Sequence, residues 1–334
     1  MNLQTKYMGL TLKNPIVAGA SGLTGDLELM KQLEASGAAA IVIKSLFQEE
    51  MQLENLKFDE YLERYNDLHA EMISPHPKIQ HCGPKEHLFW VKKAKESVEI
   101  PVIASINAID EDVWVDYAKA LEETGVDGLE LNFYTIPKDS QYIGEDIEKD
   151  QIRILKRIKE TVKIPVSVKL SPYYTNITNF LKKLDEAKID GVVLFNRFLQ
   201  LDIDIENEVE ENFFTFSDES ESRLPLRWTA LLSDQLNTDI CSSTGIMTSK
   251  DVVKMLLTGA SCVQVVSTLY KNRIEYLSSI IQGVESWMQS KNYDSIKSFQ
   301  GKMSKNNMKD PWAFERVQYI KMLYSQEDIL EINL

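Results

Sequence analysis

Lysine and asparagine side chains stand at the ends of several otherwise apolar, β-branched runs of this sequence. Lys44 and Lys169 each end one such run, and Asn132 and Asn196 end two others. Lysine is almost never fully buried unless it is paired. A single lysine that only reaches solvent would explain any one of these positions, but not the whole set. Together they could stabilise negative charge that develops on a substrate and orient that substrate by hydrogen bonds.

Hydroxyl and glycine residues end three further runs. The first run leads into Ala20, Ser21 and Gly22, and the last two lead into Ser243-Thr244-Gly245 and Val266-Ser267-Thr268. Backbone N–H groups and hydroxyls just before a helix can hold a phosphate, although helix capping would use the same residue types. Their place after the last two strands favours phosphate in a barrel protein.

All four histidines lie in one stretch, residues 69–87, beside Cys82. The spacing of His69, His76, His81 and His87 matches no strong metal motif. We therefore predict solvated loop histidines and no metal. Three widely spaced cysteines, Cys82, Cys241 and Cys262, favour a reducing compartment without a disulfide framework.

The elements that must position these residues alternate between strands and helices. Strands are predicted at 16–20, 38–45, 102–108, 128–133, 165–171, 191–197, 239–245 and 262–269, with helical segments such as 111–124, 150–162 and 249–257 between them. Eight such units predict an α/β fold, a closed (β/α)8 TIM barrel. An open doubly wound sheet is the alternative, but no GxGxxG follows a strand.

The remaining segments complete one predicted domain over residues 1–334. Residues 5–15 read as a β-hairpin that could cap the bottom of the barrel, which spans about 10–290. Long βα loops follow strands 2 (46–85) and 6 (198–224), and we expect them to cover the barrel mouth. A helical extension is predicted for 291–334, where the aromatic stretch 314–324 is typical of core or dimer packing and leaves a homodimer open.

Composition narrows the class of protein. The chain has 334 residues, with 37 Lys plus Arg against 51 Asp plus Glu, a formal charge of −14. Such a surface repels nucleic acid. No apolar run reaches the length of a membrane span, and the first residues lack a signal peptide. We expect a cytoplasmic enzyme that acts on a small molecule.

Six motifs, in this order and spacing, resemble the dihydroorotate dehydrogenase family of FMN-dependent barrels. They run from about residue 10 to residue 270: LTLKNPI (10–16), ASG (20–22), IKS (43–45), LELN (129–132), PVSVKLSP (165–172) and TGASCVQVVSTLY (258–270). The resemblance implies hydride transfer between a substrate C–H and flavin N5, in oxidation of a CH–CH bond as in pyrimidine metabolism. The protein part of such a reaction is to bind and orient the cofactor and to tune its charge.

The resemblance also implies roles for individual residues. Lys169 would lie near flavin N1 and O2, Lys44 would contact the ring edge and a substrate carboxylate, and Thr135 would handle the proton. Substrate contacts would come from Asn132, Asn196 and Arg197. The implied FMN contacts are Ala20, Ser21, Gly22, Lys44, Ser45, Asn132, Lys169, Phe195, Ser243, Thr244, Gly245, Val266 and Ser267.

The sequence departs from the family at several of these places. Thr135 stands where the family has its Cys or Ser base, and Pro137 replaces an asparagine that binds the pyrimidine. Arg197 replaces a small hydroxyl residue, and Val266 replaces a glycine. Residues 222–228 stand in place of a glycine-rich phosphate loop, where Arg223 or Arg227 could add a phosphate contact.

These departures weaken an orotate site more than the flavin site that the resemblance implies. We therefore expect FMN with a substrate other than dihydroorotate, one that could bear a carboxylate. Two alternatives remain at this stage. One is a non-redox lyase or aldolase that uses Lys169 as a Schiff-base amine. The other is a flavin-binding protein without catalysis.

Overall fold

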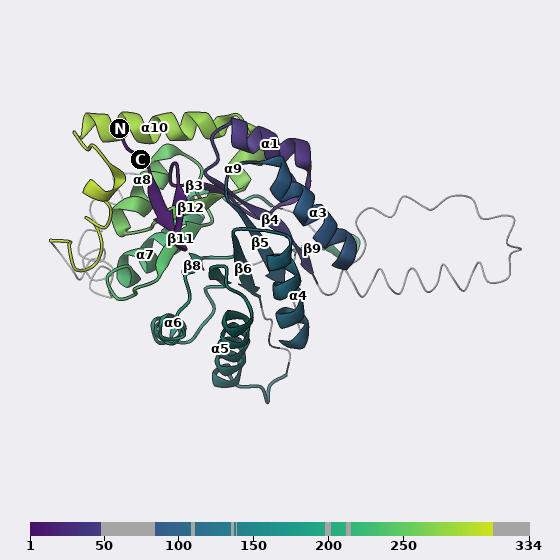
Figure 1. Cartoon of the computed structure of the whole chain (residues 1–334). Helices are drawn as coiled ribbons and strands as arrows, with labels where there is room; N and C mark the ends of the chain where they lie inside the picture. The colour runs from purple at the N-terminus through teal and green to yellow at the C-terminus, as the bar shows by residue number, and fades with distance from the viewer. Residues whose placement is uncertain are drawn as a thin grey trace, which may run out of the picture.

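Eight parallel strands close into a barrel, which confirms the predicted TIM-barrel class (Figure 1). The computed structural model describes residues 1–47, 84–107, 111–134, 137, 139–197, 202–211 and 215–309. Neighbouring strands follow the order β11-β12-β3-β4-β5-β6-β7-β8 around the barrel. Their bounds are β3 Ile16–Ala18, β4 Ala40–Phe47, β5 Val102–Asn107, β6 Gly128–Phe133, β7 Val166–Leu170, β8 Gly191–Leu194, β11 Asp239–Ser243 and β12 Cys262–Val265.

Helices surround the barrel and cover its outer face (Figure 1). They are α1 Leu27–Ala35, α3 Pro84–Ser97, α4 Glu111–Glu123, α5 Gly144–Thr161, α6 Ile177–Glu186, α7 Arg223–Leu232, α8 Ser249–Thr258, α9 Ser267–Asn272 and α10 Tyr276–Ser290, with 3-10 turns η1 Gly22–Gly25, η3 Glu219–Ser222 and η4 Ile296–Ser298. Each amphipathic helix packs its apolar stripe on the strands. Helix α6, for example, buries Ile177, Phe180, Leu181 and Leu184, positions that share one helical face.

Glycines with positive φ follow three of the helices, and a capping box begins α8. Gly37, Gly125 and Gly259 all adopt positive φ just after a helix, where a left-handed residue ends the helix without strain. Thr248 is the N-cap of α8 and forms a capping box with Asp251. Helix α5 begins at Gly144, earlier than the predicted segment.

The N-terminal hairpin closes the bottom of the barrel, as the sequence predicted. Its strands are β1 Thr5–Tyr7 and β2 Leu10–Leu12, and the buried side chains of Tyr7 and Met8 join the apolar cluster inside the barrel. A Cβ on Gly191 would lie 2.8 Å from Met8 Cγ and 2.9 Å from Tyr7 Cε2. Glycine is therefore required where the hairpin enters the barrel.

Cys241 and Cys262 also belong to this internal cluster, as buried free thiols at paired positions of neighbouring strands. Burial raises the pKa of the Cys262 thiol well above its usual value. An uncharged thiol behaves as a small apolar side chain. Both cysteines therefore serve packing.

The long connections are described in part. Residues 48–83, most of the first predicted loop, lie outside the described residues. After β8, a short hairpin forms from β9 Asp202–Asp204 and β10 Val209–Glu211, and η3 leads into α7. Residues 291–309 form turns and η4 where the helical extension was predicted, and positive φ at Asn292 and Gly301 is typical of such turns. The rest of that predicted extension, 310–334 with its aromatic stretch 314–324, lies outside the described residues.

Among the described residues, no helix has the length and apolar character needed to cross a membrane.

Candidate active site

A cavity of about 500 Å³ opens at the carboxyl ends of the barrel strands, a volume typical of small-molecule and cofactor sites. Side chains and backbone from seven of the eight strand ends, β3 to β7, β11 and β12, and from the loop after β8 reach it. Of the predicted site residues, the cavity gathers Ala20, Ser21, Gly22, Lys44, Ser45, Asn132, Lys169, Asn196, Arg197, Ser243, Thr244, Gly245, Val266 and Ser267.

Two predicted site residues are not found in this cavity. Thr135 lies outside the described residues. Phe195 is buried but lines a second cavity instead. Its backbone explains the difference, because Phe195 N–H donates to Ser243 O at 3.3 Å and its carbonyl accepts from Thr244 Oγ1 at 3.0 Å. The main chain of Phe195, and not its ring, supports the mouth of the barrel.

Lys169, Glu130 and Gln264 form a polar cluster at the floor of the cavity. Lys169 Nζ lies 3.7 Å from Glu130 Oε1 and 3.3 Å from Gln264 Oε1. Gln264 Nε2 donates to Glu130 Oε2 at 2.5 Å. The side chain of Glu130 is 1% exposed and that of Lys169 10%. A buried cation is thus held by a carboxylate and an amide, as charge burial requires.

A β-bulge in β4 turns two consecutive residues toward the cavity. The pairing of β4 with β5 shifts between Ile43 and Leu46, and Lys44 and Ser45 in that interval both line the cavity. Bulges re-aim side chains in this way beside active sites. Ser45 Oγ donates to Ser105 Oγ at 2.6 Å, which fixes the Ser45 hydroxyl against β5.

The two asparagines of the predicted site are hydrogen-bonded to each other. Asn196 Nδ2 donates to Asn132 Oδ1 at 2.9 Å. This bond orients Asn132 so that its amide NH2 group is left to donate elsewhere. The loop after β8 is thereby tied to the end of β6.

Hydroxyls and backbone amides line the far end of the cavity. Ser217 Oγ donates to Ser267 Oγ at 2.9 Å and accepts from Gly245 N–H at 3.4 Å. Lys271 Nζ donates to the carbonyl of Ser217 at 2.9 Å, so a cation lies behind this group. The residue types suit a phosphate, which takes hydrogen bonds from hydroxyls and backbone N–H groups.

Gly245 has φ +73°, and a Cβ there would lie 2.3 Å from Ser222 N. The loop after β11 therefore packs directly on the backbone that leads into α7. No other residue fits that contact without displacing the chain.

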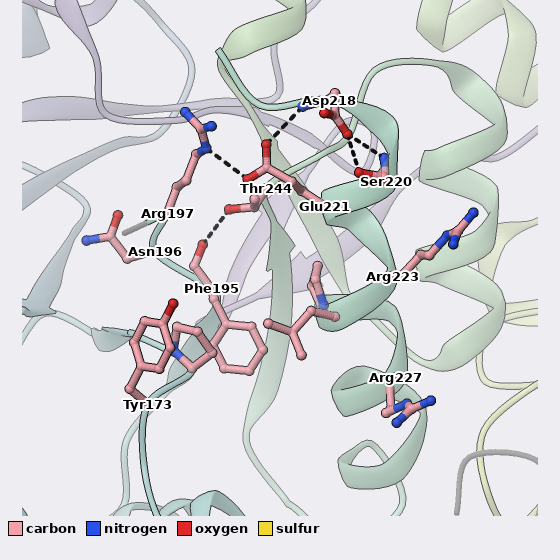
Figure 2. A pocket seen from close by; sticks show the side chains of 13 residues that line it. Tyr173, Phe195, Asn196, Arg197, Asp218, Ser220, Glu221, Arg223, Arg227 and Thr244 are labelled. Carbon is pink, nitrogen blue, oxygen red and sulfur yellow. Dashed lines mark hydrogen bonds and ion pairs between the residues drawn. The ribbon is translucent and has the colours of Figure 1, made fainter. Parts of the chain in front are cut away.

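Arg197 lines both the central cavity and a second cavity of about 670 Å³, which Figure 2 shows. Its Nε donates to Glu221 Oε2 at 2.9 Å, and its terminal nitrogens donate to the carbonyl and hydroxyl of Thr215. The guanidinium thus holds residues 215–221 against the end of β8. Its remaining N–H groups can still meet an anion from the cavity.

Arg223 and Arg227 do not reach the central cavity. They line the second one and point from α7 away from the rings of Tyr173 and Phe195 (Figure 2). The phosphate contact considered from the sequence is therefore not supported for either arginine.

No group of three potential metal ligands occurs within the described part of the chain. His69, His76, His81 and Cys82 lie outside it. His87 is buried on α3, where its Nδ1 lies 2.5 Å from the hydroxyl of Tyr117. Burial also raises the pKa of Tyr117. The contact joins α3 to α4, so the prediction of a solvated loop histidine is wrong for His87.

Sequence reasoning missed Glu130, Gln264 and Ser217 as cavity residues. Alternation along the strands was the available signal for the first two. Glu130 and Asn132 are two apart on β6, and Gln264 and Val266 are two apart at the end of β12, so each pair faces the same side. Ser217 follows a long loop, and no periodicity marks it.

The family model for dihydroorotate dehydrogenase matches residues 2–288. The chain belongs to the dihydroorotate dehydrogenase family. The matched residues include all eight barrel strands and every residue of the central cavity.

Three relatives share the name dihydroorotate dehydrogenase B (NAD(+)), catalytic subunit. The protein of Pyrococcus furiosus is 28% identical over 310 residues, which cover 90% of this chain and 98% of that protein. The protein of Methanocaldococcus jannaschii is 27% identical over 302 residues, covering 87% and 94%. The protein of Thermoplasma volcanium is 28% identical over 312 residues, covering 90% and 98%. The chain is thus a dihydroorotate dehydrogenase-like oxidoreductase.

Proposed function

We propose that the central cavity binds FMN and that the protein catalyses hydride transfer between a substrate C–H and the flavin. One observation carries this proposal: the same cavity contains the Lys169 side chain and a group of hydroxyls and backbone amides at Ser217, Gly245 and Ser267. A flavin mononucleotide needs both features, because it has a ring that gains negative charge on reduction and a phosphate. Bound FMN would supply the hydride acceptor at its N5.

The residues present fit this cofactor. Glu130 Oε1 is buried and has no hydrogen-bond partner among the described residues, and an unsatisfied group of this kind is typical of functional sites. Gly22 has no side chain, and a Cβ there would lie 2.8 Å from Tyr270 Oη, so its main chain stays accessible from the cavity. Ala20, Ser21 and Gly22 would meet the ring through main-chain atoms, as the family resemblance implies.

We assign the other roles by chemistry. Lys169 would stabilise the reduced ring, and Ser243, Thr244, Gly245, Val266 and Ser267 would hold the phosphate side. Lys44 and Arg197 would bind a substrate carboxylate, with Asn132 and Asn196 as hydrogen-bond partners. Thr135 would move the substrate proton, which requires an activating neighbour because a free hydroxyl is a poor base.

The lyase alternative is disfavoured by the surroundings of Lys169. A Schiff base requires a neutral amine, whereas the Glu130 carboxylate 3.7 Å away attracts a charged ammonium.

Anaerobic mixing of the FMN-loaded protein with dihydroorotate, and with other small carboxylates, tests the function. We expect at least one donor to bleach the flavin absorbance, and we expect dihydroorotate to be a poor one. Lys169→Met should slow the bleaching by about a hundredfold or more, as for loss of one preorganised charge, whereas Lys31→Met on the surface of α1 should not. Bleaching by dithionite but by no substrate would indicate a flavin-binding protein without catalysis.

A further inference from the structure

We propose that Glu130 is a positioning residue that fixes the Lys169 ammonium and, by its own charge, keeps the reduction potential of the bound flavin low. This inference rests on the proposed FMN site. Lys169 alone would be a simple cation at the cavity floor. The buried carboxylate beside it makes the floor an ion pair.

Glu130 is held in place from two sides of the barrel. It lies on β6, the strand that pairs with the Lys169 strand β7, and its Oε2 accepts from Gln264 on β12. Strand β12 lies four positions from β6 in the closed order of eight, on the opposite side of the barrel. Gln264 therefore spans the barrel interior and restricts rotation of the carboxylate, while its Oε1 accepts from Lys169.

The free oxygen of Glu130 points its charge toward Lys169 and the cavity. Oε1 is buried, accepts no hydrogen bond among the described residues, and lies 3.7 Å from Lys169 Nζ. For a distant group, two opposite charges at this separation largely cancel. A flavin ring inside the cavity would interact with each charge separately, and the low dielectric of the interior strengthens both interactions. Lys44 and Arg197 also line the cavity and contribute positive charge from its rim.

The sign of the effect follows from the charge balance of the reaction. Addition of a hydride brings two electrons and one proton to the oxidised ring and leaves it with one more negative charge. Lys169 stabilises that charge and raises the potential, whereas Glu130 repels it and lowers the potential. Removal of the Glu130 charge should therefore raise the flavin potential, and removal of the Lys169 charge should lower it.

Glu130→Gln keeps the shape of the side chain, and its amide oxygen can still accept from Gln264. The test compares wild type, Glu130→Gln, Lys169→Met and the double variant, each loaded with FMN. The anaerobic midpoint potential is measured against reference dyes, and the FMN dissociation constant is measured by titration. Glu28→Gln, on the exposed face of α1, is the matched control.

We expect Glu130→Gln to raise the ratio of reduced to oxidised flavin at a fixed potential by at least tenfold, which is about 30 mV for a two-electron couple. Lys169→Met should lower the ratio by at least tenfold, and the double variant should return to within threefold of wild type. Glu130→Asp, which keeps the charge, should also stay within threefold.

An unchanged or lowered ratio in Glu130→Gln, with FMN still bound, overturns the inference. Should that variant fail to fold, Gln264→Glu adds a second carboxylate to the same floor and should lower the ratio, and no change there overturns the inference equally. Failure of the wild-type protein to bind FMN contradicts the proposed function instead, so the two claims fail by different results.

Discussion

Arg197 is the residue whose role distinguishes this chain most clearly from the family pattern. Its guanidinium is held by Glu221 and Thr215 and still lines the central cavity. It can therefore act on a substrate anion, on the loop at 215–221, or on both. The two roles are separable because Glu221 supports the loop contact alone.

Arg197→Gln should raise KM for a carboxylate substrate by about tenfold or more, as for loss of a charged hydrogen bond. Glu221→Gln leaves the arginine present and should change KM by less than threefold. Steady-state kinetics of the two variants checks this. Equal losses in both would assign Arg197 to holding the loop.

Glu130 and Lys169 also show what sequence patterns can and cannot predict about single residues. A lysine at the end of an apolar strand is conspicuous, so Lys169 was identified. The contact of Glu130 with Gln264 joins strands far apart in the sequence, and no local pattern contains it. The same limit applies to the bulge that turns both Lys44 and Ser45 toward the cavity.

The loop between β11 and α8 positions the far end of the cavity through the packing of Gly245. A side chain at this position would meet the backbone of Ser222 and Asp218. Gly245→Ala should therefore weaken FMN binding at least tenfold. Gly125→Ala is the matched control, because Gly125 has a similar φ of +88° but open space around it.

The control should cost about 1 kcal/mol of stability from backbone strain and leave FMN affinity unchanged. Fluorescence titration with FMN, alongside urea unfolding, measures both effects. Normal affinity in Gly245→Ala would show that this loop does not form the phosphate end.

The same loop is fixed at its other end by the cap of α8. Asp251 Oδ2 accepts from Thr248 N–H at 3.0 Å and Thr248 Oγ1 at 2.9 Å. Burial raises the pKa of Asp251, but hydrogen bonds from Lys254 and Thr248 outweigh it and hold the pKa below its usual value. The charged carboxylate therefore stabilises the fold.

Because the folded pKa is lowered, this stabilisation is complete above the unfolded pKa of about 3.9 and is lost as the pH falls through the folded value. Asp251→Ala should cost about 1–3 kcal/mol at neutral pH and less in acid. Asp251→Asn should abolish the pH-dependent part. Urea unfolding at neutral pH and in steps below pH 4 tests this. A cost that does not change with pH would contradict the assignment.

Across the whole molecule, one end of the barrel serves stability and the other serves chemistry. The Tyr7–Met8 hairpin fills the bottom, and the cavity opens at the opposite, carboxyl ends of the strands. This division is general in barrel enzymes. It predicts that the two ends respond differently to mutation.

Tyr7→Ala should lower the free energy of unfolding by about 3–5 kcal/mol, as for other large buried aromatic residues. The affinity for FMN should stay within threefold of wild type. Tyr173→Ala, at a residue that is 67% exposed, should leave stability nearly unchanged. A large loss of FMN binding in Tyr7→Ala would mean that the two ends are coupled.

The barrel itself was predictable because each strand is a short apolar run buried on both faces, and each helix has one apolar stripe. The strand ends were less predictable. The predicted strands 191–197, 239–245 and 262–269 extend too far, since Asn196 and Gly245 belong to loops and Ser267 begins α9. The polar residues at the barrel mouth come after the last hydrogen bonds between the strands. The helix predicted beyond residue 291 gives way to turns over 291–309, since serine and asparagine compete with helical hydrogen bonds.

The central claim is that the cavity at the barrel mouth binds FMN. The visible absorption spectrum of the purified protein, followed by acid release and identification of the chromophore, tests it most directly. We predict two flavin bands and release of FMN. A colourless protein that also fails to bind added FMN would contradict the proposed cofactor and with it the proposed reaction.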